Sequence, residues 1–202
     1  MNINDFVFVK DNAFSDEFCD EIVDVFEHYD SQNVTYEGQS GKGIDHNTKR
    51  TKDLDFLRIP ELKDRFSEEI TSTFNEYLVK EYLEQLPYQD KFPALNLFFG
   101  ETFYECLQVQ RYRKNEGHYN AWHIETGNFD MSKRMFVFIL YLTDVMEGGE
   151  TELLYSGLKT QPRKGRLVIH PSTYPYVHKG HMPKDNDKYI LTTWLSFTPP
   201  QF

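Results

Sequence analysis

Hydrophobic positions in the first third of the chain recur at helical spacing. A first stripe of apolar residues consists of Phe18, Ile22, Phe26 and Tyr29. This stripe predicts an amphipathic helix over residues 16–29, with Ser15 as its N-cap. A second stripe, which predicts a helix beginning at Pro60, consists of Leu62, Phe66, Ile70, Phe74 and Tyr77. Both stripes are typical of helix faces packed on a core, and a short apolar strand is predicted before them at 6–9.

The second half of the chain has the pattern of strands. Leu107 and Val109 alternate with Gln108 and Gln110, so one strand face is apolar and the other polar. A polar face turned inward suits the wall of a ligand-holding barrel, whereas one turned outward is a solvated edge. The apolar run at 135–142 predicts a strand buried on both faces. Turns separate three further predicted strands, at 150–153, 166–171 and 189–197.

Helices followed by short strands predict an α+β fold. The strand spacing suits a jelly roll, that is, a double-stranded β-helix that can hold a ligand between its sheets. We expect a single domain over residues 1–202, with helical support in about 1–100 and the jelly-roll core in about 101–202.

One long stretch follows neither period. Residues 30–55 are polar and rich in Gly, Ser, Asn and Lys. A stretch of this length within one domain is either disordered or a lid over a functional site. His46 and Arg50 lie in it and are interpreted as solvated. A further loop is predicted between Pro87 and Pro93.

Composition and charge narrow the classes of partner. The chain has 202 residues, of which 39% are hydrophobic and 16% aromatic, as expected of a folded domain rather than a disordered chain. Its 22 basic and 32 acidic side chains give a net charge of −10. That charge repels nucleic acid and anionic membrane, so we expect neither as a partner. Neither the charge nor the composition indicates which oligomeric state the protein has.

Two cysteines and the absence of apolar segments indicate the compartment. Cys19 and Cys106 are expected to be unpaired thiols, because disulfide scaffolds are shorter and richer in cysteine. Residues 1–5 show no signal-peptide pattern, and no apolar stretch approaches transmembrane length. A cytoplasmic protein is expected.

The short motif His123-Ile124-Glu125 points to metal chemistry. On a β-strand, residues two apart point to the same face, so the imidazole and the carboxylate would project side by side. A distant histidine would complete two histidines and one carboxylate, the set that holds non-haem Fe(II) and leaves coordination positions open. His178, followed two positions later by a glycine, suits this role, with His181 and His170 as rivals.

The order of several motifs carries a family resemblance. In chain order they are Tyr112, the segment 117–125, Arg134, Tyr141-Leu142-Thr143-Asp144, the glycine turn at 147–152, residues 162–166, His178-Lys179-Gly180, Lys188 and Trp194. This order resembles the Fe(II)/2-oxoglutarate-dependent oxygenases of the prolyl hydroxylase-like group. The resemblance extends from Gln108 to Phe197, about half of the chain.

The resemblance implies specific roles for residues of this sequence. It implies that the iron ligands are His123, Glu125 and His178. Lys188 would pair with the distal carboxylate of 2-oxoglutarate, Tyr141 would donate a hydrogen bond to the same cosubstrate, Tyr112 would lie near the cosubstrate or substrate, and Trp194 would line the opposite wall. The implied cofactors are Fe(II), 2-oxoglutarate and O2, with ascorbate as a reductant. Physical chemistry agrees, because a dicarboxylate chelating a metal at one end needs a cation at its far end.

Two positions differ from the usual family pattern. The metal carboxylate is commonly an aspartate and here is Glu125, and His170 stands where a phenylalanine commonly precedes proline. Three functions follow as hypotheses. The first is hydroxylation of a C–H bond, most readily on a prolyl residue of a peptide or protein. The second is hydroxylation of a free amino acid or other small molecule. The third is a non-catalytic binding protein that keeps the fold.

Overall fold

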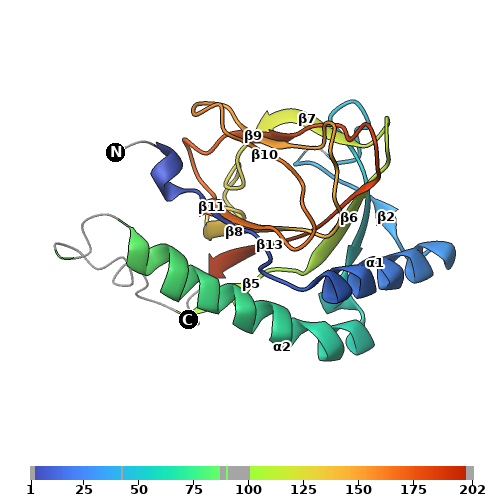
Figure 1. Cartoon of the computed structure of the whole chain (residues 1–202), viewed down its shortest axis with the longest axis horizontal. Coiled ribbons are helices and arrows are strands. Elements are labelled where there is room, and N and C mark those ends of the chain that lie inside the picture. The colour runs from blue at the N-terminus through green and yellow to red at the C-terminus, as the bar shows by residue number, and fades with distance from the viewer. Residues whose placement is uncertain (1–2, 42, 87–89, 91–100, 199–202) are drawn as a thin grey trace.

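The computed structural model describes residues 3–41, 43–86, 90 and 101–198, and its strands form two sheets that face each other (Figure 1). The major sheet follows the order β1-β11-β8-β13-β6-β4-β2, with β5 paired to β13. Its strands are β1 Phe8–Lys10, β2 Tyr36–Glu37, β4 Lys52–Asp55, β5 Thr102–Tyr104, β6 Gln108–Tyr112, β8 Arg134–Tyr141, β11 Leu167–Pro171 and β13 Lys188–Phe197. The minor sheet follows the order β10-β9-β12-β7-β3. Its strands are β3 Lys49–Arg50, β7 His118–His123, β9 Thr151–Leu153, β10 Lys159–Thr160 and β12 His178–Gly180.

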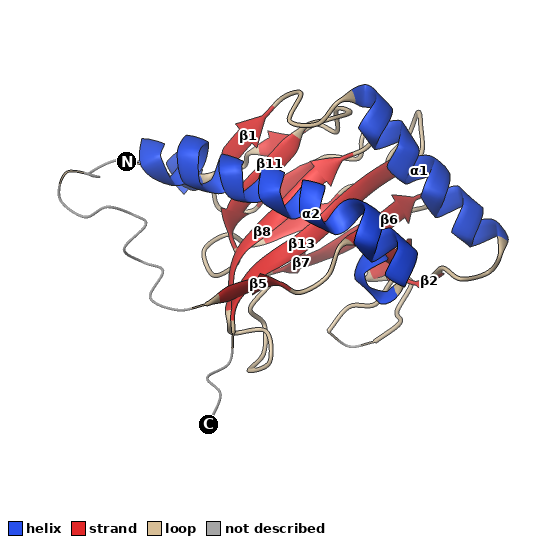
Figure 2. Ribbon diagram, turned by 90° about the horizontal axis from the view of Figure 1, so that it is seen from below, coloured by secondary structure: helices blue, strands red, loops and turns tan. Residues whose placement is uncertain are grey.

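Two long helices lie across the outer face of the major sheet, as Figure 2 shows. They are α1 Asp16–Ser31 and α2 Pro60–Glu76, which confirms both predicted helices. The Ser15 hydroxyl accepts a hydrogen bond from the Phe18 N–H at 3.2 Å, so the predicted N-cap is present. The shorter turns are η1 Ile3–Phe6, η2 Phe56–Arg58, the π-turn η3 Tyr77–Tyr82 and η4 Leu83–Gln85.

The helices bury one face of the major sheet and leave the other for the cavity. Phe74 of α2 stacks on Phe138 of β8 with ring centroids 4.9 Å apart, within one large apolar core. On β6, Val109 belongs to this core, whereas Gln108 and Gln110 line the space between the sheets. The polar face of this strand therefore points inward, the first of the two alternatives that its alternation allowed. The apolar run at 135–142 forms β8, which is buried along most of its length.

The described residues of the polar stretch at 30–55, all but residue 42, connect the two sheets through short strands. Its three short strands pair as β2 with β4, β3 with β7, and β4 with β6. Because β3 and β4 are separated by Thr51 alone, the chain passes directly from the minor sheet to the major sheet and closes one side of the jelly roll. Of the two alternatives, disorder is therefore wrong for the described residues of this stretch. Strands of two to four residues are too short for alternation to show in the sequence.

Two further expectations need adjustment. The first strand begins at Phe8 rather than residue 6, because a 3-10 turn occupies Ile3–Phe6. The N-terminal half supplies strands β1 to β4 as well as helices, so support and core interleave along the chain. The single domain over 1–202 stays a prediction, and the loop between Pro87 and Pro93 falls almost wholly outside the described residues.

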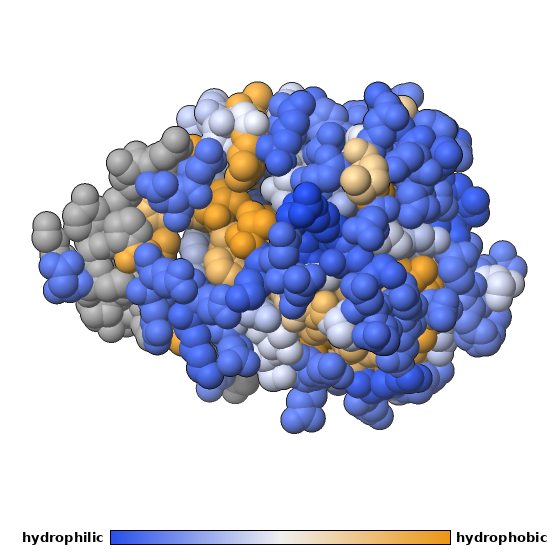
Figure 3. Space-filling view, in the orientation of Figure 1, coloured by the Kyte–Doolittle hydropathy of each residue, from blue (hydrophilic) through white to orange (hydrophobic). Residues whose placement is uncertain are grey.

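The surface is largely polar. The face shown in Figure 3 is mostly hydrophilic, with smaller hydrophobic patches between the polar groups. Within the described ranges, the structure has no helix that combines the length and the apolar character needed to cross a bilayer.

Candidate metal centre and cosubstrate cavity

A cavity of about 1220 Å³ lies between the two sheets. His123, Glu125 and His178 line it. It is also lined by Lys188 and Tyr112, which the family resemblance places at or near the cosubstrate, and by Trp194, which it places on the opposite wall. Tyr141 is the one predicted site residue that does not reach its wall. The volume exceeds the range of roughly 300–1,000 Å³ of most small-molecule sites, so it has room for a small ligand and part of a second one.

His123, Glu125 and His178 come together at one corner of this cavity. His123 ends β7, His178 begins β12, and the two residues are direct partners across this strand pair. Glu125 Oε1 lies 3.2 Å from His178 Nε2 and 3.6 Å from His123 Nε2. The three ligand atoms all lie within 4.8 Å of one another, and among the described residues they form the one such metal-ligating group.

Glu125 reaches this corner from a turn and not from a strand. The strand ends at His123, and the backbone N–H of Glu125 donates to the carbonyl of Ser172 at 3.0 Å. The prediction that alternation along one strand places the carboxylate beside the imidazole is therefore wrong in its mechanism. The turn carries the backbone away from β7, and the glutamate side chain returns to the two histidines.

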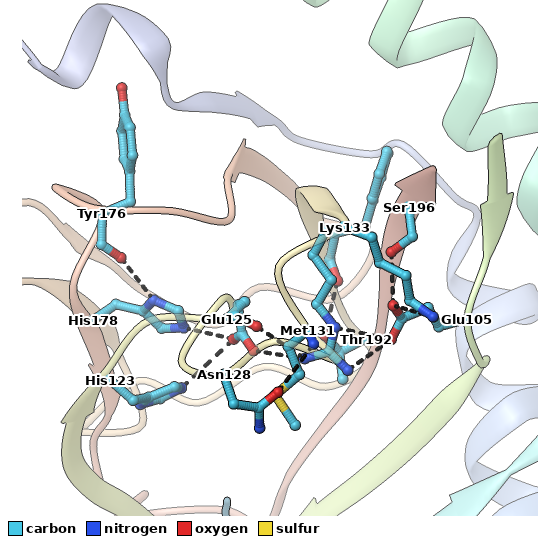
Figure 4. A network of polar contacts seen from close by, with 12 residues as sticks. Glu105, His123, Glu125, Asn128, Met131, Lys133, Tyr176, His178, Thr192 and Ser196 are labelled. Carbon is cyan, nitrogen blue, oxygen red and sulfur yellow. Dashed lines mark hydrogen bonds and ion pairs between the residues drawn. The ribbon is translucent and has the colours of Figure 1, made fainter. Parts of the chain in front are cut away.

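Backbone carbonyls fix the orientation of both imidazoles. The Nδ1 atom of His123 lies 2.9 Å from the Ala121 carbonyl. The Nδ1 atom of His178 lies 3.0 Å from the Tyr176 carbonyl, as Figure 4 shows. A carbonyl only accepts, so each Nδ1 carries the proton and each Nε2 can offer a lone pair to a metal in the cavity.

Protonation at this corner suits cation binding. Burial, together with the neighbouring His178, lowers the pKa of His123. Burial acts to raise the pKa of Glu125, but its contacts with the two histidines outweigh this and hold the pKa well below its usual range. A neutral imidazole beside an ionised carboxylate is the donor set that a divalent cation requires.

Lys188 forms the opposite end of the same cavity. Its side chain is 1% exposed, and its Nζ donates to the Gly149 carbonyl at 2.9 Å and lies 4.0 Å from the centre of the Tyr112 ring. Within the described part of the chain, no carboxylate forms an ion pair with it. Burial accordingly lowers the pKa of Lys188 to about 7, although Glu150 acts to raise it. Binding of an anion would supply the counter-ion that this buried amine lacks among the described residues, as the predicted role of Lys188 requires.

Gly180 keeps open the space between the two ends. It follows His178 by two residues on β12, which corresponds to about 7 Å along a strand. A Cβ atom at this position would stand 3.7 Å from Lys188 Nζ and 3.7 Å from Tyr119 Cβ. His178 of the metal corner and the Lys188 ammonium therefore both lie beside β12, and both line the same cavity.

The other predicted cosubstrate residues differ in their access to the cavity. The Tyr112 hydroxyl donates a hydrogen bond to Gln110 at 2.8 Å. The Arg134 guanidinium lies over the Trp194 ring, with its central carbon 3.9 Å from the ring centre. The Tyr141 hydroxyl donates to the Thr151 hydroxyl at 2.7 Å, and Thr151 is the residue that lines the cavity. In this structure Tyr141 can therefore act on a ligand only through Thr151.

Neither rival histidine belongs to the metal-ligating group. His181 Nε2 lies 2.5 Å from Glu152 Oε2, outside the metal corner. His170 is buried beside His178 with ring centroids 5.0 Å apart, and burial lowers its pKa to about 3. The geometry favours His178 as the distal member of the group.

A comparison with known protein families matches the part of the chain that carries this geometry. Residues 107–196 match the family model of the 2OG-Fe(II) oxygenase superfamily, and this segment contains His123, Glu125, His178 and Lys188. This segment belongs to the 2OG-Fe(II) oxygenase superfamily.

Curated relatives of the oxygenase segment are prolyl hydroxylases. The chain is 27% identical over 127 residues to prolyl 4-hydroxylase 13 of Arabidopsis thaliana, and 28% identical over 118 residues to the probable prolyl 4-hydroxylase 9 of the same plant. These matches cover 50% and 48% of this chain, and 46% and 41% of the two relatives. The chain thus spans less than half of the length of the curated relatives it matches.

Solved structures confirm the fold of the oxygenase. A Trichoplax adhaerens prolyl hydroxylase in complex with a hypoxia-inducible factor peptide fragment superimposes with a TM-score of 0.71 at 18% identity, covering 96% of this chain and 84% of that one. The viral collagen prolyl hydroxylase of Paramecium bursaria Chlorella virus-1 superimposes with a TM-score of 0.61 at 18% identity, covering 96% and 97%. The predicted jelly-roll core with supporting helices is therefore confirmed.

The oxygenase superfamily implies Fe(II), 2-oxoglutarate and O2, and the donor set fits the metal. Two ligands each about 2.1 Å from one ion stand about 3 Å apart when they are adjacent in its coordination sphere. The separations of 3.2 and 3.6 Å between Glu125 and the two histidines are close to that value. Two imidazoles and one carboxylate also match the preference of non-haem Fe(II).

Three residues at the site were not assigned by the sequence. Arg134 and Glu105 line the cavity beside Glu125, and Thr151 stands between Tyr141 and the cavity. Arg134 belongs to the motif order that carries the family resemblance, but it has no assigned role there. A basic residue at the start of a buried strand is its signal in the sequence, whereas Glu105 and Thr151 carry none.

Proposed function

We propose that this protein is an Fe(II)- and 2-oxoglutarate-dependent oxygenase that hydroxylates a C–H bond, most readily that of a prolyl residue in a peptide or protein. The observation that carries the proposal is the pairing of two features in one cavity. The group His123, Glu125 and His178 stands at one end, and the unpaired Lys188 ammonium stands at the other.

The side chains divide the work of binding. His123, Glu125 and His178 hold the iron, which supplies the activation of O2 when it is bound. Lys188 holds the far carboxylate of 2-oxoglutarate, and Thr151, oriented by Tyr141, offers a hydroxyl beside it. One oxygen atom of O2 enters the product alcohol and the other enters succinate, with release of CO2. Ascorbate serves as the reductant that keeps the iron in its ferrous state.

Two observations support a peptide rather than a small molecule as substrate. The curated relatives are named prolyl 4-hydroxylases, and one structural neighbour was solved with a peptide fragment. The cavity also exceeds the size that 2-oxoglutarate alone requires, and it is bordered by residues of the 30–55 connection such as Tyr36, Gln39 and Thr48. An extended chain can lie along such a border with one side chain inserted.

The test is turnover of a matched peptide pair. The purified protein, reconstituted with Fe(II), 2-oxoglutarate and ascorbate, is incubated with a proline-containing peptide and with the same peptide carrying alanine in place of proline. We expect succinate release and a mass increase of one oxygen atom with the first peptide only, and neither with His178→Ala. Stimulation by free amino acids instead of peptides would overturn the substrate assignment. Absence of succinate with every substrate, from protein shown to bind metal, would overturn the activity.

A further inference from the structure

The two oxygens of the Glu125 carboxylate face different partners. Oε1 faces the histidines, at 3.2 Å from His178 Nε2 and 3.6 Å from His123 Nε2. Oε2 faces Arg134, at 3.6 Å from Nη1, and the same Nη1 donates to the backbone carbonyl of Glu125 at 3.2 Å. The carboxylate therefore lies between the metal corner and a guanidinium, and each partner addresses one oxygen.

Arg134 is itself held on its other sides. Its Nε and Nη2 donate to Glu105 Oε2 at 2.8 and 2.7 Å, which fixes one edge of the guanidinium. Its flat face lies on Trp194, 3.9 Å from the ring centre. Glu105 in turn accepts from the Ser196 hydroxyl at 2.7 Å. Figure 4 shows this network, with the histidines on one side of Glu125 and Glu105 with Ser196 on the other.

We propose that Arg134 is a positioning residue for the metal carboxylate. It holds Glu125 Oε2 so that only Oε1 is presented to the metal. This inference rests on the metal site of the proposed function, and it concerns the geometry of one ligand rather than the reaction.

The need for such a residue follows from the length of glutamate. Glutamate has one more rotatable bond than aspartate, and a free carboxylate can bind a cation through one oxygen or through both. Binding through both would use a coordination position that the oxygenase needs for cosubstrate or O2. A guanidinium anchored by Glu105 and Trp194 removes that alternative, because it engages the second oxygen from a fixed place.

A positioning role and a simple charge effect of Arg134 predict opposite changes in metal affinity when Arg134 is removed, so an affinity measurement distinguishes them. If Arg134 acted only as a nearby positive charge, its removal would tighten the binding of a divalent cation. If it positions Glu125, its removal loosens binding by roughly tenfold to a hundredfold, the usual effect of losing an outer partner of a metal ligand.

The experiment measures Mn(II) binding by calorimetry and electron paramagnetic resonance, in the absence of 2-oxoglutarate and O2. Arg134→Gln is expected to weaken Mn(II) binding by about tenfold or more and to change the resonance spectrum. Arg134→Lys should bind Mn(II) more tightly than Arg134→Gln, because lysine keeps the positive charge but lacks the planar guanidinium with its several N–H donors. Thermal melting checks that each variant is folded, and Glu105→Gln provides a second way to loosen the guanidinium if Arg134→Gln fails to fold.

Two comparisons make the result specific. Arg111→Gln is the matched control, because Arg111, like Arg134, is paired with two acids. Its partners are Glu27 and Asp30, and it lies on the helix side of the major sheet. It should leave Mn(II) binding unchanged. In a Glu125→Asp background the Arg134→Gln effect should shrink to within about threefold, since the shorter carboxylate no longer spans both partners.

Unchanged or tighter Mn(II) binding by Arg134→Gln would overturn the proposal, and so would an equal effect in the Glu125→Asp background. These results are distinct from failure of the proposed function. A protein that binds Mn(II) with the expected coupling but turns over nothing would lose its activity assignment and keep this one.

Discussion

The two ends of the cavity differ in how their charges are balanced. At the metal corner, Glu125 is surrounded by His123, His178 and Arg134, and its pKa is held well below its usual range. At the opposite end, Lys188 has backbone carbonyls and an aromatic ring as neighbours, and burial lowers its pKa to about 7. The carboxylate of the metal corner thus has ionisable side chains on both sides, whereas Lys188 has no acidic ion-pair partner among the described residues.

This difference teaches how the two ligands are expected to bind. The metal corner is organised in advance by backbone hydrogen bonds to both imidazoles, so a cation enters a site whose geometry already exists. The lysine end carries an unpaired buried charge that costs stability until an anion binds. Cosubstrate binding should therefore depend on the protonation and charge of Lys188. Metal binding should depend on the presence of each of the three metal-ligating side chains.

The largest effect is expected from removal of a metal ligand. His178→Ala deletes a ligand at the centre of the group, and we expect loss of measurable Mn(II) or Fe(II) binding and of all turnover. His181→Ala is the matched control, since His181 is paired with Glu152 outside the corner, and it should largely keep both. The reverse result would move the distal ligand to His181.

The next effect removes the charge at the other end. Lys188→Ala should raise the apparent constant for 2-oxoglutarate by roughly tenfold to a hundredfold, because a charge-assisted contact in a dry site contributes about 1.5–3 kcal/mol. Metal binding should stay near normal. Lys179→Ala is the control, because that lysine is a neighbour on β12 whose ammonium lies over Trp122 and near Glu152. Equal constants for the two variants would make Lys188 a bystander.

A pH titration sharpens the comparison without mutation. Free Lys188 loses its proton above about pH 7, whereas a bound carboxylate raises its pKa. The affinity for 2-oxoglutarate should therefore fall by up to about tenfold per pH unit above neutrality, with proton uptake on binding. In the ligand-free protein the unfolded state holds the proton up to about 10.5, so the contribution of Lys188 to stability rises with pH between about 7 and 10.5. Calorimetry in buffers of different ionisation enthalpy measures the uptake, and a flat profile would contradict it.

The smallest effect is expected from shortening the side chain of Glu125. Glu125→Asp should keep the metal but lose part of the activity, because Oε1 now stands 3.2 and 3.6 Å from the histidine nitrogens and aspartate reaches less far from the turn. Turnover with Fe(II) and 2-oxoglutarate measures it. An inactive wild type and an active aspartate variant would instead support the non-catalytic alternative.

Sequence patterns located most of the fold because its elements are long and amphipathic. The stripes from Phe18 and from Leu62 became α1 and α2, and the apolar run became β8. The strands β2, β3 and β4 were missed because their residues are polar and their length is two to four residues. They are set by pairing, β3 with β7, β4 with β6 and β2 with β4, which is a property of the tertiary structure.

The site was predictable in membership more than in geometry. The structure brings together His123, Glu125 and His178, but Glu125 arrives from a turn that the sequence does not reveal. Tyr141 is expected at the cosubstrate, but it does not line the cavity, because its hydroxyl donates to Thr151, which does. The hydrogen bonds from Arg134 to Glu105 could not be predicted from the sequence, because the two residues are 29 positions apart.

The central claim is that one dicarboxylate spans the metal corner and Lys188, and calorimetric titration of 2-oxoglutarate tests it most directly. The titration is made anaerobically into metal-free protein, into Mn(II)-loaded protein and into Mn(II)-loaded Lys188→Ala. We predict tight binding only to the loaded wild type, with binding weaker by about tenfold or more when either the metal or the lysine is removed. Equal affinity in all three samples would contradict the claim, because 2-oxoglutarate would then bind at neither end of the cavity.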